Sequence, residues 1–474
     1  MVLTNPVRRV AVIGAGSSGL AANRYLLAER YFEKIDVYEQ QSSVGGVWNY
    51  TPRSLKVGMS TTVPHLNPHE PVQEPIWTNQ PEGTSELNFV SPLYAEPETN
   101  IPKDLMRYSD QPFPEEAQLF PKHHTTSSNL IQQVKDVKLK NPELSTCDLT
   151  TRNLHTGTET TSMYDAVVVA SGHFAVPYIP EISGIEAWDR PYPKAISHSK
   201  FYDSAEEFRS KKVIVVGSSA SGLDIGAQIN QSSKGKVIVS QKSESYLAAL
   251  VPSDKIIHSE IVSFLTPSEY DRAVQFADGH IEKEVDAIVF CTGYFYSFPF
   301  LESIKPSFIT HGWRTMNVYQ QLIFIDHPTL AFPMLSQRVI PFPMAENQAS
   351  VFSRVWSGRI HLPEHRVMRE AEAREISQKG EGKAFHVLPF PMDADYLNHL
   401  YNWAATAEAR PGLINDGKGK LGTCWGDREH WMQALFPDIR WAFVQKEDQR
   451  SEIKTLTALG FDFGSWKKEQ EEQW

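Results

Sequence analysis

The chain has 474 residues, a formal net charge of −11 at pH 7, and an apolar content of 41%. This length is too great for one ordinary core, so two or three domains are expected, and the acidic balance argues against a nucleic-acid-binding protein. No apolar stretch is long enough to predict a membrane span and the N-terminus shows no secretory signal, so we expect a cytoplasmic globular protein.

The first glycine-rich turn lies inside a strand–helix–strand pattern. A strand is predicted at Arg9–Ile13, a helix from about Ser18 to Arg30, and a second strand at Lys34–Glu39. The turn between the first strand and the helix reads Gly-Ala-Gly-Ser-Ser-Gly over residues 14–19. A βαβ unit of about 30 residues with this pattern is typical of a dinucleotide-binding fold.

Each glycine of this turn has a physical role in holding a pyrophosphate. The first permits the tight turn, the second lets the backbone approach the phosphates, and the third lets helix and strand pack closely. Free N–H groups and the helix dipole attract the negative charge. Glu39 ends the second strand 20 residues after Gly19 (39 − 19), where a carboxylate accepts hydrogen bonds from ribose hydroxyls. The candidate cofactor contacts of this unit are Gly14, Gly16, Ser17, Gly19 and Glu39.

Residues 51–122 differ from the unit before them, because proline recurs throughout the segment. Such a density of proline prevents long helices and central strands. We therefore expect an irregular insert that packs through its aromatic residues. The pattern after it predicts a helix near Ser127–Lys140.

The strand–turn–helix unit then recurs. Met163–Gly172 and Glu284–Gly293 are similar buried-type strands, and each ends at a small residue followed by glycine. Each closes a unit that begins with a glycine-rich turn, since a second turn lies at 217–222. We predict an α/β fold with two dinucleotide-binding, Rossmann-like domains, the second inserted into the first. The expected bounds are 1–176 for the first part of the first domain, 177–296 for the inserted domain, and 297–474 for the return of the first domain and a C-terminal region with a helix near 365–380.

The second turn differs from the first in two ways. Ser219 replaces the middle glycine, so the backbone is expected to lie slightly farther from the phosphates. Its second strand ends without an acid, and Lys242 follows. A carboxylate would repel a 2′-phosphate whereas a lysine pairs with it, so NADPH is favoured over NADH; alternatively, Lys242 is a solvated surface residue. The candidate contacts are Gly217, Ser218, Ser219, Ser221 and Lys242.

Two such turns suit an enzyme that brings a flavin and a nicotinamide together. Further motifs follow the first turn. In the order of the chain they are Gly45-Gly46-Val47-Trp48, Thr99–Lys103, Met106–Asp110, Tyr192–Asp203, and Cys291-Thr292-Gly293-Tyr294. Over residues 8–350, the series that these motifs form with the two glycine turns resembles that of the class B flavin-containing monooxygenases.

The match to the family fingerprint FxGxxxHxxx(F/Y)K is incomplete. Tyr192 stands for Phe, Lys194 for Gly, and Asp203 for Lys. Tyr202 favours the flavin-containing monooxygenases, whereas Asp203 is similar to the related Baeyer–Villiger enzymes. The motif therefore leaves the subclass open.

The resemblance implies an activity. NADPH reduces FAD, oxygen adds to form a C4a-hydroperoxyflavin that NADP⁺ shields, and a small-molecule amine nitrogen or sulfide sulfur takes up one oxygen atom. The protein orients the reactants, donates hydrogen bonds and excludes water. The family places an Asn of the TNxP motif beside the hydroperoxide, so Asn100 is the candidate catalytic residue; its alternative role is to cap the turn before Pro102. The resemblance also implies cofactor contacts from Gly46, Val47, Trp48, Thr292 and Gly293.

Two further residues have weaker predicted roles. Gln348 follows Pro341-Phe342-Pro343 and is expected to line the flavin pocket, or else to cap a helix or lie on the surface. His198 is expected to position the NADPH unit rather than to act as an acid or base.

Other functions are weighed against this interpretation. A disulfide reductase needs a close pair of redox cysteines, and the chain has only three widely spaced ones, which also predict no disulfide scaffold and no metal site. A Baeyer–Villiger monooxygenase acting on a ketone, an N-hydroxylase of amino acids and a non-enzymatic nucleotide-binding protein stay open. A homo-oligomer is compatible with the sequence.

Overall fold

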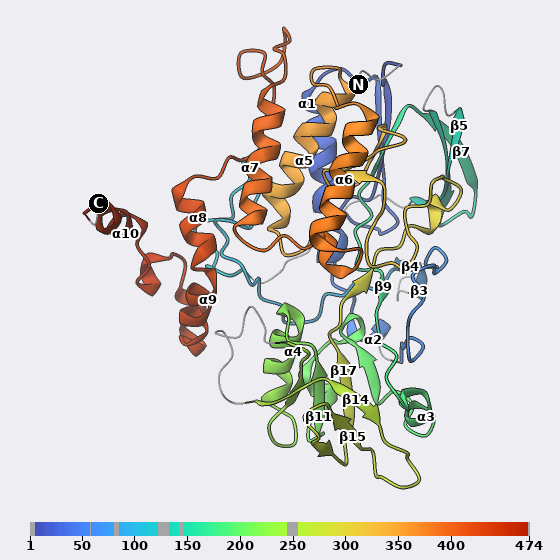
Figure 1. Ribbon diagram of the computed structural model, residues 1–474, viewed down its shortest axis with the longest axis vertical. Helices are drawn as coiled ribbons and strands as arrows, with labels where there is room; N and C mark the ends of the chain where they lie inside the picture. Colours follow the sequence, from blue (N-terminus) through green and yellow to red (C-terminus); the bar gives the residue numbers. More distant parts are fainter. Residues whose placement is uncertain are drawn as a thin grey trace.

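A mixed sheet, whose parallel central strands are predominantly β-branched, forms the centre of the larger lobe, which is the upper one in the ribbon view (Figure 1). The computed structural model describes residues 5–56, 58–79, 85–121, 132–141, 146–243 and 255–472. The central strands are buried on both faces, as expected for valine- and isoleucine-rich parallel strands. In spatial order the six strands are β19 (Val318–Tyr319), β20 (Ile323–Phe324), β21 (Leu330–Ala331), β8 (Ala166–Val169), β1 (Arg9–Ile13) and β2 (Lys34–Tyr38).

The smaller, lower lobe contains another sheet, which has five strands (Figure 1). Its strands pair in parallel throughout, which requires crossovers of the kind that helices provide. In spatial order they are β10 (Ile196–His198), β17 (Ala287–Phe290), β11 (Val213–Val216), β12 (Ile238–Ser240) and β13 (Ile256–His258). The predicted α/β class, with two dinucleotide-type units and one inserted into the other, is confirmed.

Smaller antiparallel sheets surround these two. Two short strands, β9 and β18, form the ribbon through which the chain enters and leaves the lower lobe. The others form a hairpin, β3–β4, and two three-stranded sheets, β5–β6–β7 and β14–β15–β16. Their bounds are β3 (Ile76–Asn79), β4 (Ser85–Asn88), β5 (Gln132–Asn141), β6 (Thr146–Asn153), β7 (Glu159–Tyr164), β9 (Val176–Pro177), β14 (Ile261–Phe264), β15 (Val274–Phe276), β16 (Ile281–Glu282) and β18 (Tyr294–Phe295).

Helices cover the first sheet and extend to the C-terminus. Helix α5 packs against both α1 and α7, and α8 to α10 lead to an arm that projects from the body (Figure 1). Within the described residues, no helix combines the length and apolar character needed to cross a membrane. The helices are α1 (Ser17–Ala28), α2 (Arg53–Lys56), α3 (Ile185–Asp189), α4 (Ala220–Asn230), α5 (Pro341–Trp356), α6 (His365–Lys379), α7 (Met392–Ala405), α8 (Asp427–Ala434), α9 (Phe436–Val444) and α10 (Phe463–Glu472).

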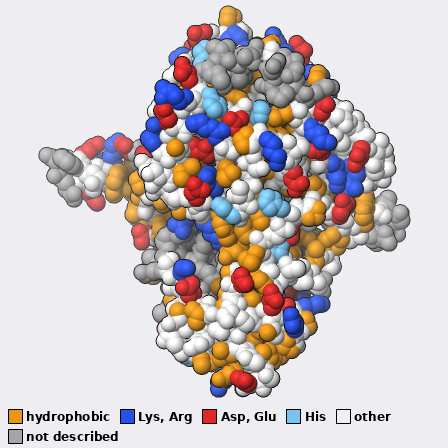
Figure 2. Space-filling model, turned by 45° about the vertical axis from the view of Figure 1, so that its right-hand side comes forward, with side chains coloured by type: hydrophobic (Ala, Val, Ile, Leu, Met, Phe, Trp, Pro, Cys, Tyr) orange, Lys and Arg blue, Asp and Glu red, His pale blue; other side chains and the backbone are white. Residues whose placement is uncertain are grey.

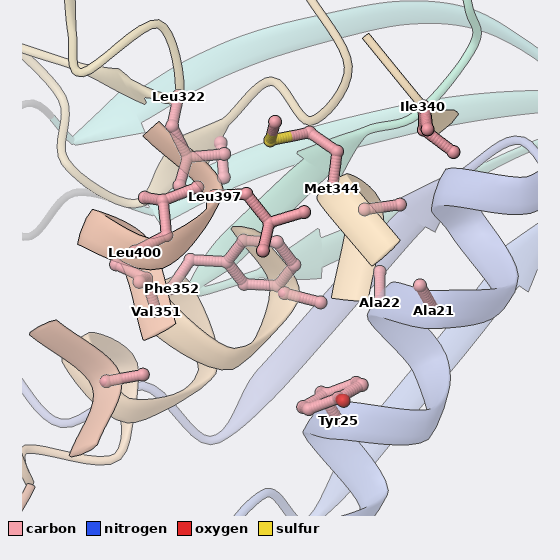
Figure 3. Packing of buried hydrophobic residues seen from close by; sticks show 14 of the residues in the cluster. Ala21, Ala22, Tyr25, Leu322, Ile340, Met344, Val351, Phe352, Leu397 and Leu400 are labelled. Carbon is pink, nitrogen blue, oxygen red and sulfur yellow. The ribbon is translucent and has the colours of Figure 1, made fainter. Parts of the chain in front are cut away.

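The main core lies between α1, α5 and α7 (Figure 3). Ala21 and Ala22 on α1 are fully buried, and their small side chains let α5 approach closely. Phe352 on α5 and Leu397 on α7 fill the space beside them. Hydrophobic side chains also gather across the middle of the face drawn in Figure 2.

One predicted element is wrong. The helix expected near Ser127–Lys140 is the strand β5 over its described part, whereas residues 127–131 lie outside the described residues. Val134 and Val137 are buried, and β5 pairs antiparallel with β6 along most of its length. Long-range strand pairing thus decides the structure of a segment whose local pattern is ambiguous. The proline-rich insert, in contrast, is mostly irregular, and the helix predicted near 365–380 is α6.

Candidate functional site

The first glycine-rich turn joins β1 to α1, and its glycines serve different purposes. Gly14 has a φ of 99°, and a Cβ there would lie 2.5 Å from the Ala170 carbonyl oxygen. A Cβ on Gly19 would lie 1.9 Å from the Gly14 carbonyl oxygen. A Cβ on Gly16 would meet only the backbone of Gly46, at ordinary contact distances of 3.5 Å to Cα and 3.9 Å to N. Protein packing therefore requires glycine at 14 and 19, whereas position 16 needs glycine only if a ligand comes close.

Glu39 fastens the end of β2 to this turn. Its Oε2 accepts a hydrogen bond from the Ala15 N–H at 2.7 Å, and its Oε1 accepts one from the Gln41 N–H at 2.9 Å. The side chain is buried, and burial raises the pKa of its carboxyl, while these N–H donors oppose the rise. Each carboxylate oxygen keeps a second lone pair, so the group can still accept from ribose hydroxyls.

The segment predicted to follow the first turn lies against it. The short 3₁₀ turn Gly46–Trp48 is brought close because the Gly45 N–H donates to the Ala15 carbonyl at 2.9 Å. Val47 is partly exposed at 36%, and Trp48 stacks on Phe342 of α5 with ring centroids 6.3 Å apart. Gly46, Val47 and Trp48 thus share one site with the first turn.

The sequence interpretation missed an aromatic support for this site. Tyr108 packs edge-on against Phe342 at 4.9 Å, and its hydroxyl donates to the Ser17 carbonyl at 2.7 Å. The next residue, Ser109, is bound through its N–H and hydroxyl to the buried carboxylate of Glu346, at 2.7 and 2.9 Å. Tyr108 lies in a motif that the resemblance already identified, but nothing in the sequence indicated its contact with α5.

The second turn joins β11 to α4 and repeats the backbone of the first. Gly217 has a φ of 106°, and its Cβ would lie 2.7 Å from the Cys291 carbonyl oxygen. Gly222 is as tightly packed, with a Cβ position 2.0 Å from the Gly217 carbonyl oxygen. Ser219 has φ −80° and ψ −176°, close to the −75° and −171° of Gly16. The serine therefore leaves the path of the backbone unchanged.

Both helices begin with N–H groups that no side chain caps. The residues before α1 and α4 are Gly16 and Ser219, and neither makes a side-chain cap hydrogen bond. The first turn of each helix also has no acidic residue. Free N–H groups at a helix start bind anions, and both turns lie at the carboxyl ends of parallel strands, where dinucleotides bind. The residues present thus fit two dinucleotides, and Gly217, Ser218, Ser219 and Ser221 lie together at the second site.

Lys242 lies apart from the second turn. The Gly217 N–H donates to the Ser240 carbonyl at 2.9 Å, so the end of β12 adjoins the turn. Two residues farther on, the Lys242 side chain is 83% exposed, and its Nζ lies 3.6 Å from the Glu260 carboxylate. Its predicted contact with a 2′-phosphate stays a prediction.

Thr292 and Gly293 follow β17 and connect the second site to the ribbon. The Thr292 hydroxyl donates to the Tyr178 carbonyl. The Gly293 carbonyl accepts from the Tyr178 N–H and faces His198 Nε2, both at 3.0 Å. Because His198 Nδ1 accepts from the Lys200 N–H at 3.1 Å, Nε2 carries the proton. Burial lowers the pKa of His198 to about 3, so this imidazole is a neutral link between β10 and the ribbon.

Asn100 and Gln348 are not part of either turn. Asn100 is half-buried, and its side chain has no hydrogen-bond partner in the described part of the chain. Gln348 is fully buried on α5, where its Oε1 accepts from the Met334 N–H at 2.8 Å and its Nε2 donates to the Tyr396 hydroxyl at 3.2 Å. The amide of Gln348 is thus occupied by protein partners, and the roles predicted for both residues stay predictions.

Comparison with known sequences gives two family matches. The sequence model of a family described as flavin-binding monooxygenase-like matches residues 84–269 and 257–416, and that of an NAD(P)-binding Rossmann-like domain matches residues 12–69. A thiol-specific monooxygenase of Saccharomyces cerevisiae is 31% identical over 384 residues, covering 74% of this chain and 78% of that protein. A flavin-containing monooxygenase of Arabidopsis thaliana is 30% identical over 431 residues, covering 87% of this chain and 89% of that protein.

Solved structures share the fold. The structure of S-allyl-L-cysteine S-oxygenase from Allium sativum matches with a TM-score of 0.73 at 24% identity, covering 98% of this chain and 99% of that one. The structure of Tmm from a Pelagibacter strain matches with a TM-score of 0.66 at 21% identity, covering 94% and 92%. Both lobes are therefore present, in the same order, in other proteins of known structure.

Proposed function

Because the chain belongs to the flavin-binding monooxygenase-like family, we propose that it is an FAD-containing, NADPH-dependent monooxygenase. It transfers one oxygen atom of O₂ to the sulfide sulfur or amine nitrogen of a small molecule. The observation that carries this proposal is the pair of uncapped helix N-termini, one in each lobe, each at the carboxyl end of a strand with parallel neighbours.

The two cofactors supply the redox chemistry, with oxygen activated on bound FAD as a C4a-hydroperoxyflavin and electrons delivered by NADPH. The chain holds FAD through the first turn, Glu39 and the segment Gly46–Trp48. It holds NADPH through the second turn, with Lys242 near the 2′-phosphate.

Asn100 is the residue proposed to touch the reacting atoms. Its amide offers a donor and an acceptor, and no described protein group occupies either one. It follows Thr99, whose N–H donates to the Pro121 carbonyl at 3.2 Å, so the backbone on one side of it is fixed. An amide that has no partner among the described residues, on a backbone that is fixed beside it, suits hydrogen bonding to flavin-bound oxygen.

Sulfur compounds are the first substrates to test, since a 31% identical relative is a thiol-specific monooxygenase. The purified protein should release FAD on denaturation and oxidise NADPH in air. Incubated with a thiol, a sulfide, a tertiary amine and a cyclic ketone, it should add one oxygen atom to the sulfur or nitrogen compounds, measured by mass spectrometry.

Two outcomes would contradict the proposal. Protein that binds no flavin even when FAD is supplied in excess would overturn it entirely. Conversion of the ketone to an ester, with no change in the sulfur and nitrogen compounds, would instead identify a Baeyer–Villiger monooxygenase, the function that Asp203 keeps open.

A further inference from the structure

The chain passes between the two lobes twice, and at each passage a lysine donates a hydrogen bond to a backbone carbonyl. The first crossing enters β9, and the carbonyl of Ala175, directly before this strand, accepts a hydrogen bond from Lys200 Nζ. The second crossing enters β18, and the carbonyl of Thr292, two residues before this strand, accepts one from Lys383 Nζ at 3.4 Å. Lys200 belongs to the lower lobe, whereas Lys383 comes from the segment that follows α6. The ribbon is thus fastened from both sides.

Lys383 is exposed to solvent, and its ammonium lies against two aromatic rings, of which Tyr178 directly follows β9. Its Nζ is 4.0 Å from the ring centroid of Tyr178 and 4.2 Å from that of Trp313. These two rings meet edge to face at 4.5 Å, and Phe295 of β18 lies 4.6 Å from Trp313. In the described part of the chain, no carboxylate lies within ion-pair distance of Lys383. The attraction between the ammonium and the two ring faces therefore holds this contact.

The segment that carries Lys383 is fixed in the upper lobe. Lys383 begins the 3₁₀ turn Lys383–His386, and His386 is fully buried. Its Nε2 accepts from the Thr315 N–H at 3.0 Å, and its Nδ1 donates to Gln321 Oε1 at 3.2 Å. The His386 carbonyl accepts from the Gln337 N–H at 2.7 Å. The backbone that carries Lys383 is therefore fixed to the upper lobe three residues later, at His386.

The ribbon determines how the lower lobe lies against the upper one. It leads directly into the strand end at Thr292 and Gly293, which adjoins the second glycine turn. A hydride passing from NADPH to FAD, giving NADP⁺ and FADH⁻, needs the two rings in contact, and a displacement of about 1 Å costs up to about 100-fold in rate. We propose that Lys383 is a positioning residue that holds the inserted domain in the orientation for this transfer, an inference that rests on the proposed function.

Anaerobic stopped-flow kinetics test this inference. In Lys383→Met, the rate constant of flavin reduction at saturating NADPH should fall about tenfold or more, while FAD content and the dissociation constant of NADPH stay within about twofold. Lys383→Arg keeps the cation and should recover most of the rate. The matched control is Lys211→Met, since Lys211 Nζ lies over the Phe208 ring at 5.8 Å, away from the ribbon, and this variant should be reduced at the wild-type rate.

A second measurement does not depend on activity. Hydrogen–deuterium exchange on the purified protein with its bound flavin should become faster at the Tyr178 amide and in β18 of Lys383→Met, and should stay unchanged in β1 and in Lys211→Met. A Met variant with wild-type reduction rate and wild-type exchange would overturn the role of Lys383. A wild-type protein that contains FAD but is not reduced by NADPH would instead overturn the proposed function.

Discussion

The two glycine turns have nearly the same backbone but very different surroundings. The first glycine of each turn, Gly14 or Gly217, has a positive φ and packs against the carbonyl at the end of a strand. The last glycine, Gly19 or Gly222, leaves no room for a Cβ atom, which would collide with a carbonyl oxygen of the turn. The first turn, however, is covered by Gly46 and bound by the buried Glu39. At the second, Ser219 and Ser221 are exposed, and the side chain of the charged candidate Lys242 is 83% exposed.

We expect this difference to separate a cofactor that stays bound from one that exchanges. A covered turn with a buried acceptor keeps its ligand through many cycles, whereas an open turn lets its ligand enter and leave. FAD at the first turn and NADPH at the second would match this division. Substitutions at equivalent positions of the two turns test this division directly.

The largest effect is expected at the last glycine of each turn. Gly19→Ala places a Cβ 1.9 Å from a carbonyl oxygen, and Gly222→Ala places one at 2.0 Å, so the backbone of each turn must shift. Gly19→Ala should yield protein without flavin. Gly222→Ala should retain flavin, reducible by dithionite, but lose NADPH-driven reduction by at least about 100-fold. Equal flavin loss in both variants, judged from absorbance spectra, would contradict separate sites.

Glu39→Gln should have the next largest effect and should act on flavin alone. The amide has only one acceptor oxygen for the two N–H groups that the carboxylate now serves, so flavin affinity should fall by about 2–3 kcal/mol. Burial raises the pKa of Glu39, so wild-type affinity should decrease as the pH falls through that raised value, while the affinity of the Gln variant stays flat. Fluorescence titration with FAD across the acidic range measures both effects. A Gln variant with the same pH dependence as wild type would assign the titration to another group.

Lys242→Ala should have a smaller effect, confined to the phosphorylated nicotinamide. Since its side chain is 83% exposed, the charge is screened, and NADPH affinity should fall by about tenfold. NADH affinity should be unchanged. Equal losses for the two nucleotides, measured by equilibrium titration, would show that Lys242 does not contact the 2′-phosphate.

Ser219→Gly should have the smallest effect. The backbone at this position already follows that of Gly16, so restoring glycine removes a side chain without changing the turn. NADPH affinity should change by less than about threefold, whereas a larger gain would mean that the serine keeps the phosphates away from the backbone. The same titration used for Lys242 measures it.

The sequence predicted what depends on local spacing, and failed where distant segments meet. The strand–turn–helix units are local patterns, so Gly14, Gly19, Gly217 and the boundaries of β1 could be read directly. The contact of Tyr108 with Phe342 joins positions 234 residues apart (342 − 108), and no periodicity encodes it. The predicted helix that is β5 failed for the same reason, because its partner strand β6 decides its structure.

Gln348 shows a related difficulty within the site. A glutamine after a Pro-Phe-Pro sequence looks available for a ligand, but its amide is bound by Met334 and Tyr396, which come from the segments before and after α5. Helical spacing places a side chain on a face. It does not say which neighbour covers that face.

The proposed oxidation of sulfur compounds would also threaten the protein's own thiols. Cys291 lies directly beneath the second turn, where its carbonyl limits Gly217 and its Cβ would be 3.4 Å from a Cβ on Gly222. Burial raises the pKa of its thiol to about 12, so the reactive thiolate is essentially absent at neutral pH. The packing that shapes the second turn therefore also keeps the adjacent thiol in its unreactive, protonated form.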